Sequence, residues 1–293
     1  MLDQAESLRR LVNSERVEEI KIAPKKRTTK IITVTSGKGG VGKSNFVVNL
    51  AITLQKKGNK VLVFDADVGM GNDDVLMGIY PKYTMFDAIN GKEIEDIIEQ
   101  GPAGVMLLAA GSGLNQIEDL QTEEREKFLN KLESLEGYDY IIMDTGAGIN
   151  KSVLAFISCS EELVLLTTPE PTSLTDAYSL IKATSRFKIK DKANVVVNKT
   201  FTEEEGIQTF NKLKKAVDKF LDLDVTYLGA ISDDRKLVKS VRDQVPFVIA
   251  YPNSDAAREI DIIAEKFING KEYNAKLSIG AKGVFRKLFG LFS

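Results

Sequence analysis

The sequence contains no histidine, no tryptophan and a single cysteine, Cys159, in 293 residues. One cysteine cannot form a disulfide within the chain, and this usage fits a reducing compartment. Without histidine the chain cannot build a Cys/His metal site or a Ser-His catalytic triad. These absences exclude three classes of site before any motif is considered: intrachain disulfides, Cys/His metal centres and Ser-His triads.

Long hydrophobic runs and a strong net charge are absent as well. No apolar run is long enough to span a bilayer, and the charged N-terminus is unlike a signal peptide. The net charge of −2 gives no bulk attraction to nucleic acid or to an anionic membrane. With 43% hydrophobic and 28% charged residues, the chain can form one large or two small domains with a full core. We therefore expect a soluble, cytoplasmic protein that does not bind nucleic acid.

What the sequence does contain is a β-branched run followed by a glycine-rich loop, over residues 31–44. The apolar half predicts a buried strand, and a helical period of apolar residues follows from Asn45 to Lys57. The loop between them fits the pattern G-x-x-x-x-G-K-[ST], with four residues in register: Gly37, Gly42, Lys43 and Ser44.

Each residue type in this loop suits phosphate binding. Glycines let backbone N–H groups wrap a phosphate without steric clashes, and the helix N-terminus adds partial positive charge. Lys43 is positioned to reach the β- and γ-phosphates of a nucleotide, and the Ser44 hydroxyl to ligate Mg²⁺. The stretch therefore predicts a nucleotide site.

A second lysine, Lys38, lies inside the loop. The resulting sequence, KGGVGKS, resembles the deviant Walker A loop of the MinD/ParA ATPases, in which the early lysine crosses a dimer interface to the partner's phosphates. The resemblance implies an ATP-dependent sandwich dimer with ATP and Mg²⁺ as cofactors, and catalytic roles for Lys38 and Lys43. It also implies ATP contacts along the whole loop: Gly37, Lys38, Gly39, Gly40, Val41, Gly42, Lys43, Ser44 and Asn45.

Two aspartates, Asp65 and Asp67, follow the apolar run from Val61 to Phe64. They come at the C-terminal end of a predicted buried strand, the edge at which open α/β sheets bind ligands. The stretch resembles switch I of the MinD family, D-x-D-x-G-x-x-N. The resemblance implies that Asp67 positions the attacking water and belongs to the metal site. Asp65 would support the metal shell or the loop, and capping of the next segment is the alternative.

A further hydrophobic strand ends in Asp144 and is followed by Thr-Gly-Ala-Gly. This is the Walker B form, in which the aspartate holds Mg²⁺ through a water and hydrogen-bonds Ser44. The glycines allow a mobile loop whose backbone N–H senses the γ-phosphate. The run Asp-Thr-Gly-Ala-Gly-Ile-Asn resembles switch II of the FlhG group of MinD-like proteins. We therefore expect Asp144 to be catalytic and the metal to be held by Ser44, Asp67 and Asp144.

Downstream, a strand at 193–198 ends in Asn198, which by the same resemblance reads the adenine ring through its amide. Ser232 stands where the family has a proline, which puts nucleotide contacts from residues 233–235 in doubt. Residues 73–136 receive no chemical role, and their acidic residues are expected on a solvated face.

About seven or eight strands alternate with helices, which include predicted helices at 173–187, 209–221 and 255–267. This alternation predicts an α/β fold with three α/β/α layers and a mainly parallel sheet. The resemblance, which covers residues 28–270, makes it a P-loop NTPase of the MinD type.

Residues 2–19 predict a helix, and the basic stretch from Lys21 to Lys30, which contains Pro24, predicts a linker. The start of the helix resembles the activator motif of FlhG proteins, also called YlxH or FleN. These are MinD-like ATPases that control the number and placement of bacterial flagella. In that family the segment docks on FlhF, a signal-recognition-type GTPase, and stimulates its hydrolysis. The motif residues here are Asp3, Gln4, Ala5, Leu8 and Arg9.

The last eleven residues form an amphipathic pattern when placed on a helix, with Arg286 and Lys287 opposite an apolar face. The segment is too short to span a bilayer but suits an anionic membrane interface. Packing as a final core helix is the alternative. The apolar face consists of Val284, Phe285, Leu288, Phe289, Leu291 and Phe292.

We therefore predict four parts: an activator helix (1–20), a basic linker (21–29), a MinD-like ATPase domain (30–270) and an amphipathic membrane-targeting tail (271–293). The family implies an ATP-hydrolysing, Mg²⁺-dependent switch that dimerises with ATP and associates reversibly with the inner face of the cell membrane. It would regulate flagellar number and placement, stimulating FlhF, with flagellar switch-complex proteins as further partners.

Two other classes of ATPase are alternatives. One is a MinD/ParA-type positioning ATPase for cell division or DNA partition, against which the Asp-Gln-Ala-x-x-Leu-Arg start argues. The other is an electron-transfer ATPase like the nitrogenase iron protein, which needs two cysteines per subunit where this chain has only Cys159.

Overall fold

The structure is a computed structural model that describes residues 29–67, 71–111, 130–131, 135, 137–270, 283 and 286–288. Eight strands form one sheet: β1 (Lys30–Ser36), β2 (Val61–Ala66), β3 (Glu99–Gln100), β4 (Met106–Ala109), β5 (Tyr140–Ala147), β6 (Glu162–Thr167), β7 (Lys192–Thr200) and β8 (Asp224–Ser232). Their order across the sheet is β3-β4-β2-β5-β1-β6-β7-β8. The short β3 runs antiparallel to β4, and the remaining neighbours pair in parallel.

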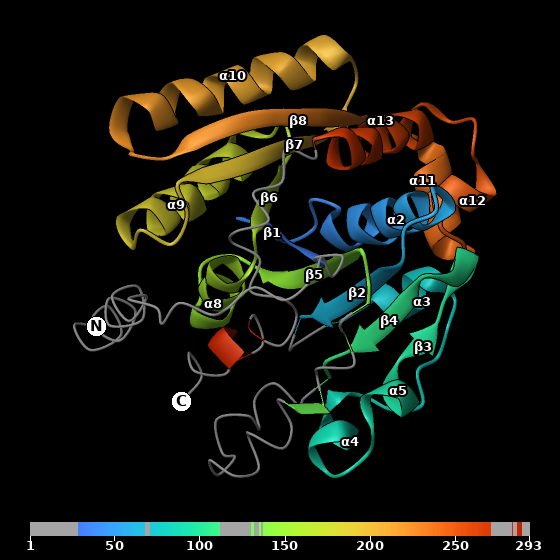
Figure 1. The fold of residues 1–293 in the computed structure, drawn as a ribbon. Helices are drawn as coiled ribbons and strands as arrows, with labels where there is room; N and C mark the ends of the chain where they lie inside the picture. Colours follow the sequence, from blue (N-terminus) through green and yellow to red (C-terminus); the bar gives the residue numbers. More distant parts are fainter. Residues whose placement is uncertain are drawn as a thin grey trace.

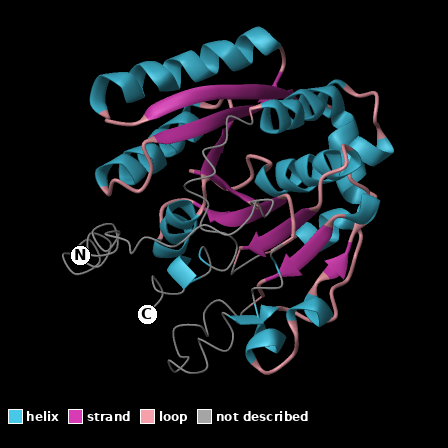
Figure 2. Ribbon diagram, in the orientation of Figure 1, coloured by secondary structure: helices cyan, strands magenta, loops and turns pink. Residues whose placement is uncertain are grey.

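Helices cover both faces of this sheet (Figures 1 and 2). They are α2 (Lys43–Lys56), α3 (Asp73–Met77), α4 (Met85–Ile89), α5 (Ile94–Ile97), α8 (Lys151–Cys159), α9 (Pro171–Arg186), α10 (Glu203–Phe220), α11 (Arg235–Arg242), α12 (Phe247–Ala250) and α13 (Asp255–Asn269), with a 3-10 turn at Pro102–Gly104. The predicted three-layer α/β/α arrangement with a mainly parallel sheet is confirmed.

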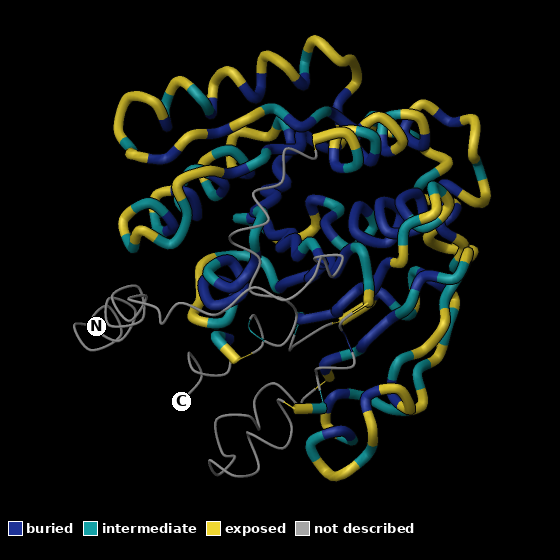
Figure 3. The backbone as a smooth tube through the Cα atoms, in the orientation of Figure 1, coloured by how far each residue is buried: buried dark blue, intermediate teal, exposed yellow. Residues whose placement is uncertain are grey.

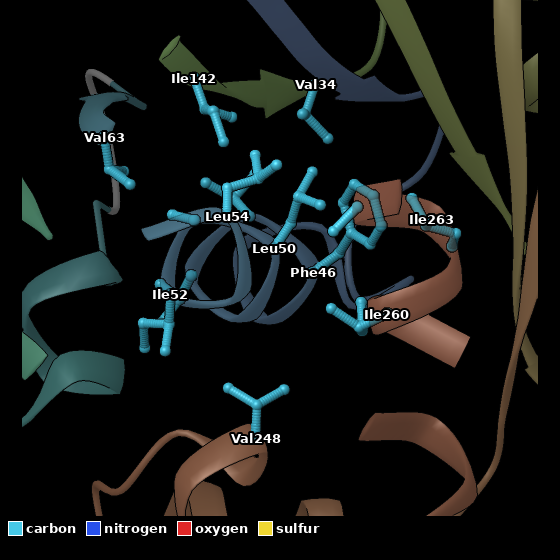
Figure 4. Close-up of a cluster of buried hydrophobic side chains, with 14 of the residues drawn as sticks. Val34, Phe46, Leu50, Ile52, Leu54, Val63, Ile142, Val248, Ile260 and Ile263 are labelled. Carbon is cyan, nitrogen blue, oxygen red and sulfur yellow. The ribbon is translucent and has the colours of Figure 1, made fainter. Parts of the chain in front are cut away.

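Helix α2 lies at the centre of one face and is buried on nearly every side (Figures 3 and 4). Its Phe46 and Leu50 pack with strand residues on that face, such as Val34, and with Ile260 of α13. Helices α8, α9 and α10 cover the opposite face with a separate apolar cluster. Because successive strand residues alternate between faces, the position of each side chain in a strand decides whether it meets α2.

That alternation places two acidic side chains beside α2. On β5, Ile142 packs in the α2 cluster and Met143 on the other face, so Asp144 returns to the α2 side. On β2, Val63 and Phe64 alternate in the same way, which puts Asp65 on the α2 side. The carboxyl ends of these strands therefore bring both aspartates to the start of α2.

The prediction that a helix begins at Thr209 is wrong: α10 begins at Glu203. The Thr202 hydroxyl caps its N-terminus by accepting the N–H of Glu205 at 3.2 Å. Gly206 in the first turn weighs against a helix in the sequence pattern. In the fold it permits close packing, because a Cβ on Gly206 would come within 2.6 Å of the Ala230 methyl.

Both predicted terminal segments lie largely outside the described residues, including Asp3, Gln4, Ala5, Leu8, Arg9, Val284, Phe285, Phe289, Leu291 and Phe292. One member of the apolar tail face is described. Leu288 is fully buried and belongs to the same hydrophobic cluster as Phe156 and Cys159 of α8. Across the described ranges, no helix is long and apolar enough to cross a membrane.

Cys159 provides a test of this packing. The thiol is 3% exposed, and burial raises its pKa to about 11. At pH 8 the thiolate population should therefore be about 100-fold below that of a free cysteine, and alkylation of the native protein should be slow. Leu288→Ala should accelerate alkylation, measured by mass spectrometry over time. Val238→Ala, at a 54% exposed position on α11, is the control and should leave the rate unchanged. Equal rates in Leu288→Ala and wild type would contradict the packing.

Candidate functional site

The glycine-rich loop connects β1 to α2, and two of its glycines are required for different reasons. Gly42 has a φ of 92°, in the left-handed region that side chains disfavour. Gly37 lies under α9, where a Cβ would come within 2.2 Å of the Asp176 backbone carbon. The loop therefore depends on both glycines for its shape.

Lys43 and Asp144 form a buried ion pair at the first turn of α2. The Ser44 hydroxyl also hydrogen-bonds to Asp144. Three residues predicted for the nucleotide and metal site, Lys43, Ser44 and Asp144, are thus brought together from two segments about 100 residues apart. Burial raises the pKa of Asp144, while the Lys43 ammonium and the hydroxyl of Ser44 act in the opposite direction.

Asp65 stands next to Asp144 on the neighbouring strand, with their Cα positions in register. Its carboxylate accepts the backbone N–H of Asp67 at 3.2 Å and that of Asp73 at 3.4 Å. A Cβ on Gly71 would come within 2.4 Å of the same carboxylate. The bond from Asp67 fits support of the segment after β2, and the bond from Asp73, the first residue of α3, fits capping of the next segment, so both readings of Asp65 stay open.

The expectation that the acidic residues of 73–136 lie on a solvated face is wrong for Asp73. It is the first residue of α3, and its side chain is fully buried. Burial and the neighbouring Asp144 and Asp65 raise the pKa of Asp73 well above its usual range. Burial and Asp144 likewise raise the pKa of Asp65 to about 7. The sequence gives no local signal for this, because an acidic pair at a helix start is ordinarily exposed.

Asp67, predicted to position the attacking water, directly follows β2 and lies beside the C-terminal end of β5. Its carboxylate is 3.5 Å from the place where a Cβ on Gly146 would be. The predicted switch I aspartate and the predicted switch II glycine are therefore neighbours.

Lys38 extends from the loop to α9 in the same chain. Its ammonium donates to the Glu170 carboxylate and to the Thr172 hydroxyl, each at 3.0 Å. The Lys38 side chain is 40% exposed and that of Glu170 60%. Such an exposed ion pair contributes little stability, so Lys38 can leave Glu170 at small cost.

Two side chains at the end of β7 bind backbone carbonyls of the glycine-rich loop. Asn198 donates its amide N–H to the Val41 carbonyl at 2.7 Å, and the Lys199 ammonium donates to the Gly40 carbonyl at 2.8 Å. Sequence reasoning expected Asn198 to read adenine, and this role stays a prediction. The contact from Lys199 was missed because it depends on packing between distant segments.

Ser232, at the position where a proline was expected, makes contacts that proline cannot. Its backbone N–H and its hydroxyl both donate to the Glu259 carboxylate of α13, at 2.7 and 2.6 Å. The substitution therefore ties the end of β8 to α13.

A model of the ParA family, described as a NUBPL iron-transfer P-loop NTPase, matches residues 27–268. The antiactivator FleN of Pseudomonas aeruginosa is 38% identical over 80% of this chain and 85% of its own length. The flagellum site-determining protein YlxH of Helicobacter pylori is 37% identical over 98% of both chains. A putative septum site-determining protein MinD of Mesostigma viride is 30% identical over 89% of this chain and 91% of its own.

Solved structures give the same assignment. MinD in a MinC:MinD complex of Aquifex aeolicus is similar with a TM-score of 0.67 and 27% identity, over 82% of this chain and 96% of that one. MinD of Pyrococcus horikoshii, complexed with Mg-ADP, has a TM-score of 0.64 and 26% identity, over 84% and 99%. The chain therefore belongs to the MinD/ParA family of P-loop ATPases, in the group of FleN and YlxH, the FlhG proteins.

Proposed function

We propose that this ATPase is an Mg²⁺-ATP-dependent switch that regulates flagellar number and placement. The observation that carries the switch is the pairing of Lys43, Ser44 and Asp144 in a loop that also contains Lys38. The flagellar role is supported by the greater identity to FleN and YlxH than to the MinD relative. A positioning role in cell division or DNA partition is the second candidate, since the MinD relative is also similar but at the lower identity of 30%.

The residues present fit magnesium. Hydroxyl and carboxylate oxygens, the ligand types that Mg²⁺ prefers, meet at Ser44 and Asp144, and Asp67 lies close to Gly146 at the end of β5. When bound, Mg²⁺ would neutralise charge that develops on the phosphates during hydrolysis. Lys43 would exchange the Asp144 carboxylate for the β- and γ-phosphates, and Asp67 would orient the attacking water.

We further propose that ATP drives dimerisation through Lys38. In the single chain this lysine contacts Glu170 and Thr172 at the surface. In a dimer it would give up these contacts for the phosphates bound by the second subunit, where a lysine finds a more highly charged partner.

The dimer proposal predicts three distinct phenotypes when nucleotide binding is measured by titration and oligomeric state by light scattering, each with ADP and with ATP. Lys43→Ala should lose nucleotide binding, because the phosphates lose their ammonium. Asp67→Ala should bind ATP and remain dimeric, since hydrolysis is blocked. Lys38→Ala should bind ATP but stay monomeric. Lys212→Ala removes an exposed lysine on α10 and is the matched control. A wild type that stays monomeric at saturating ATP would refute the proposal.

We also propose that residues 1–20 activate the GTPase FlhF. The support is the motif from Asp3 to Arg9 and an alignment with YlxH that covers 98% of both chains.

A synthetic peptide of residues 1–20 should raise the GTPase rate of FlhF, because the proposed activator works apart from the ATPase domain. Gln4→Ala should weaken the stimulation, measured as phosphate release. A peptide with the same composition in scrambled order is the control. Full stimulation by a chain that lacks residues 2–12 would show that the activator lies elsewhere.

The tail is proposed to bind an anionic membrane in the ATP-bound dimer. Burial of Leu288 beside α8 supports a state in which the apolar face is covered by the body of the same chain. Two tails on one dimer would raise avidity by about 100-fold without new contacts. A single tail would bind weakly, because ordering it offsets much of the gain from burial.

Binding to anionic liposomes should therefore depend on ATP in co-sedimentation experiments. Phe285→Glu, or truncation after Lys282, should abolish it. Alkylation of Cys159 should be faster with ATP than with ADP, since release of Leu288 uncovers α8. Equal co-sedimentation with ADP and with ATP would contradict the ATP dependence of membrane binding. Unchanged binding by the truncated chain would contradict the membrane role of the tail.

A further inference from the structure

Helix α11 lies at the surface next to α12, and only one of its eight residues, Ser240, is buried (Figure 1). Exposed cations at positions i, i+4 and i+7 form one row along its outer side: Arg235, Lys239 and Arg242. Within the described part of the chain, none of the three forms an ion pair. Asp234, just before the helix, caps it through the backbone instead. Like charges at this spacing repel each other, so an anionic partner would stabilise the row.

An apolar row runs beside this basic row. Val238 and Val241 are both exposed, and they follow one another at the i, i+3 spacing of a single helix face. Leu237 and Ser240, the residues that precede them, face the body of the protein, so the two valines lie at its edge. The outer side of α11 therefore presents cations and small apolar side chains in two neighbouring rows.

Tyr80 extends the apolar surface from a different segment. Its side chain is 77% exposed, and its phenol donates to the side-chain oxygen of Gln244 at 3.2 Å, in the turn after α11. The two segments approach closely, because a Cβ on Gly78 would come within 2.6 Å of the Gln244 carbonyl oxygen. The next residue in this turn, Val245, is exposed as well. Tyrosine is enriched at protein interfaces, where the ring contributes apolar area and the hydroxyl remains hydrogen-bonded.

We propose that the basic row, the apolar row and Tyr80, together called the α11 surface, dock an acidic amphipathic helix of a partner protein. The acidic residues of that helix would meet the basic row, while its apolar residues would cover the valines and the tyrosine ring. This inference goes beyond the proposed function, because no residue of the α11 surface belongs to the nucleotide site.

The unpaired cations call for an anionic partner, and the apolar row favours a protein helix over other polyanions. The backbone of duplex DNA offers phosphates without apolar side chains, and the net charge of −2 gives the whole chain no attraction to it. Membrane-binding helices use large apolar side chains such as Trp, Phe and Leu, whereas this row consists of valines. An amphipathic helix can present acidic and apolar residues in adjacent rows of matching spacing.

The test uses the full chain and a fluorescein-labelled synthetic helix with glutamates in one row and leucines in the adjacent row. Binding is measured by fluorescence anisotropy, and a peptide of the same composition in scrambled order is the peptide control. Wild type should bind the two-row peptide at least about 10-fold more tightly than the scrambled one, because only the first can contact both rows at once.

Two variants test the two kinds of contact. Lys239→Glu should weaken binding of the two-row peptide by about 10-fold or more, since the new carboxylate would face the glutamates of the peptide. Tyr80→Ala should weaken it by about 5-fold through lost apolar contact, although the charges of α11 are unchanged. Lys215→Glu makes the same charge change at an exposed position of α10 and is the matched control, which should bind as wild type does.

Equal binding of the two-row and scrambled peptides by wild type would overturn the proposal. Equal weakening by Lys239→Glu and Lys215→Glu would do so too, because the effect would then reflect the charge of the whole chain. If Lys239→Glu left peptide binding unchanged but abolished binding to duplex DNA or to phosphatidylglycerol vesicles, the surface would bind a nucleic acid or a membrane and not a protein helix.

Discussion

The ion pair between Lys43 and Asp144 is the interaction on which the site depends. Its two partners come from the start of α2 and the end of β5, and both side chains are almost completely buried. Removal of one partner from a buried ion pair destabilises the folded protein by about 3–5 kcal/mol, because the other charge is left buried without compensation. The pair therefore fixes the position of α2 over the sheet edge and keeps the lysine where a phosphate can compete for it. Asp65 and Asp73 lie beside this pair, and the backbone N–H of Asp67 is bonded to Asp65.

In the proposed switch, phosphates compete with a carboxylate partner for each of the two lysines of the loop. Lys43 has a buried carboxylate partner, whereas Lys38 has an exposed one. Exchange at Lys43 requires compensation of a buried charge, but exchange at Lys38 is almost free of cost. The two steps of the proposed switch therefore break ion pairs of different kinds. Nucleotide binding breaks the buried pair of Lys43 and Asp144, and dimerisation breaks the exposed pair of Lys38 and Glu170.

The sequence predicts the parts of the site that local patterns encode. The sequence predicts the glycine loop together with its flanking strand and helix. It also predicts the aspartates near the ends of two strands, because strand and helix periods place them at one sheet edge. The layer arrangement followed from the alternation of strands and helices. The start of α10 was misplaced because Gly206 has low helix propensity, and only its contact with Ala230 explains it.

Other parts depend on contacts between distant segments. Asp73 is buried because the start of α3 lies beside Asp65 of β2 and Asp144 of β5, and the sequence shows only two acids at a helix start. Ser232 departs from the family pattern, and its acceptor, Glu259, lies on a helix distant in sequence. Lys199 and Glu170 bind loop residues about 130 to 160 positions away, beyond the range of any sequence period.

The two bonds from β7 to the loop have a consequence for affinity. Asn198 and Lys199 hold the carbonyls of Val41 and Gly40, and in a trans peptide each carbonyl points opposite to the N–H of the same unit. The N–H groups of Val41 and Gly42 are thereby turned away from β7 in the free protein. Their orientation is set during folding, so an incoming phosphate meets a receptor that loses little conformational entropy when it binds.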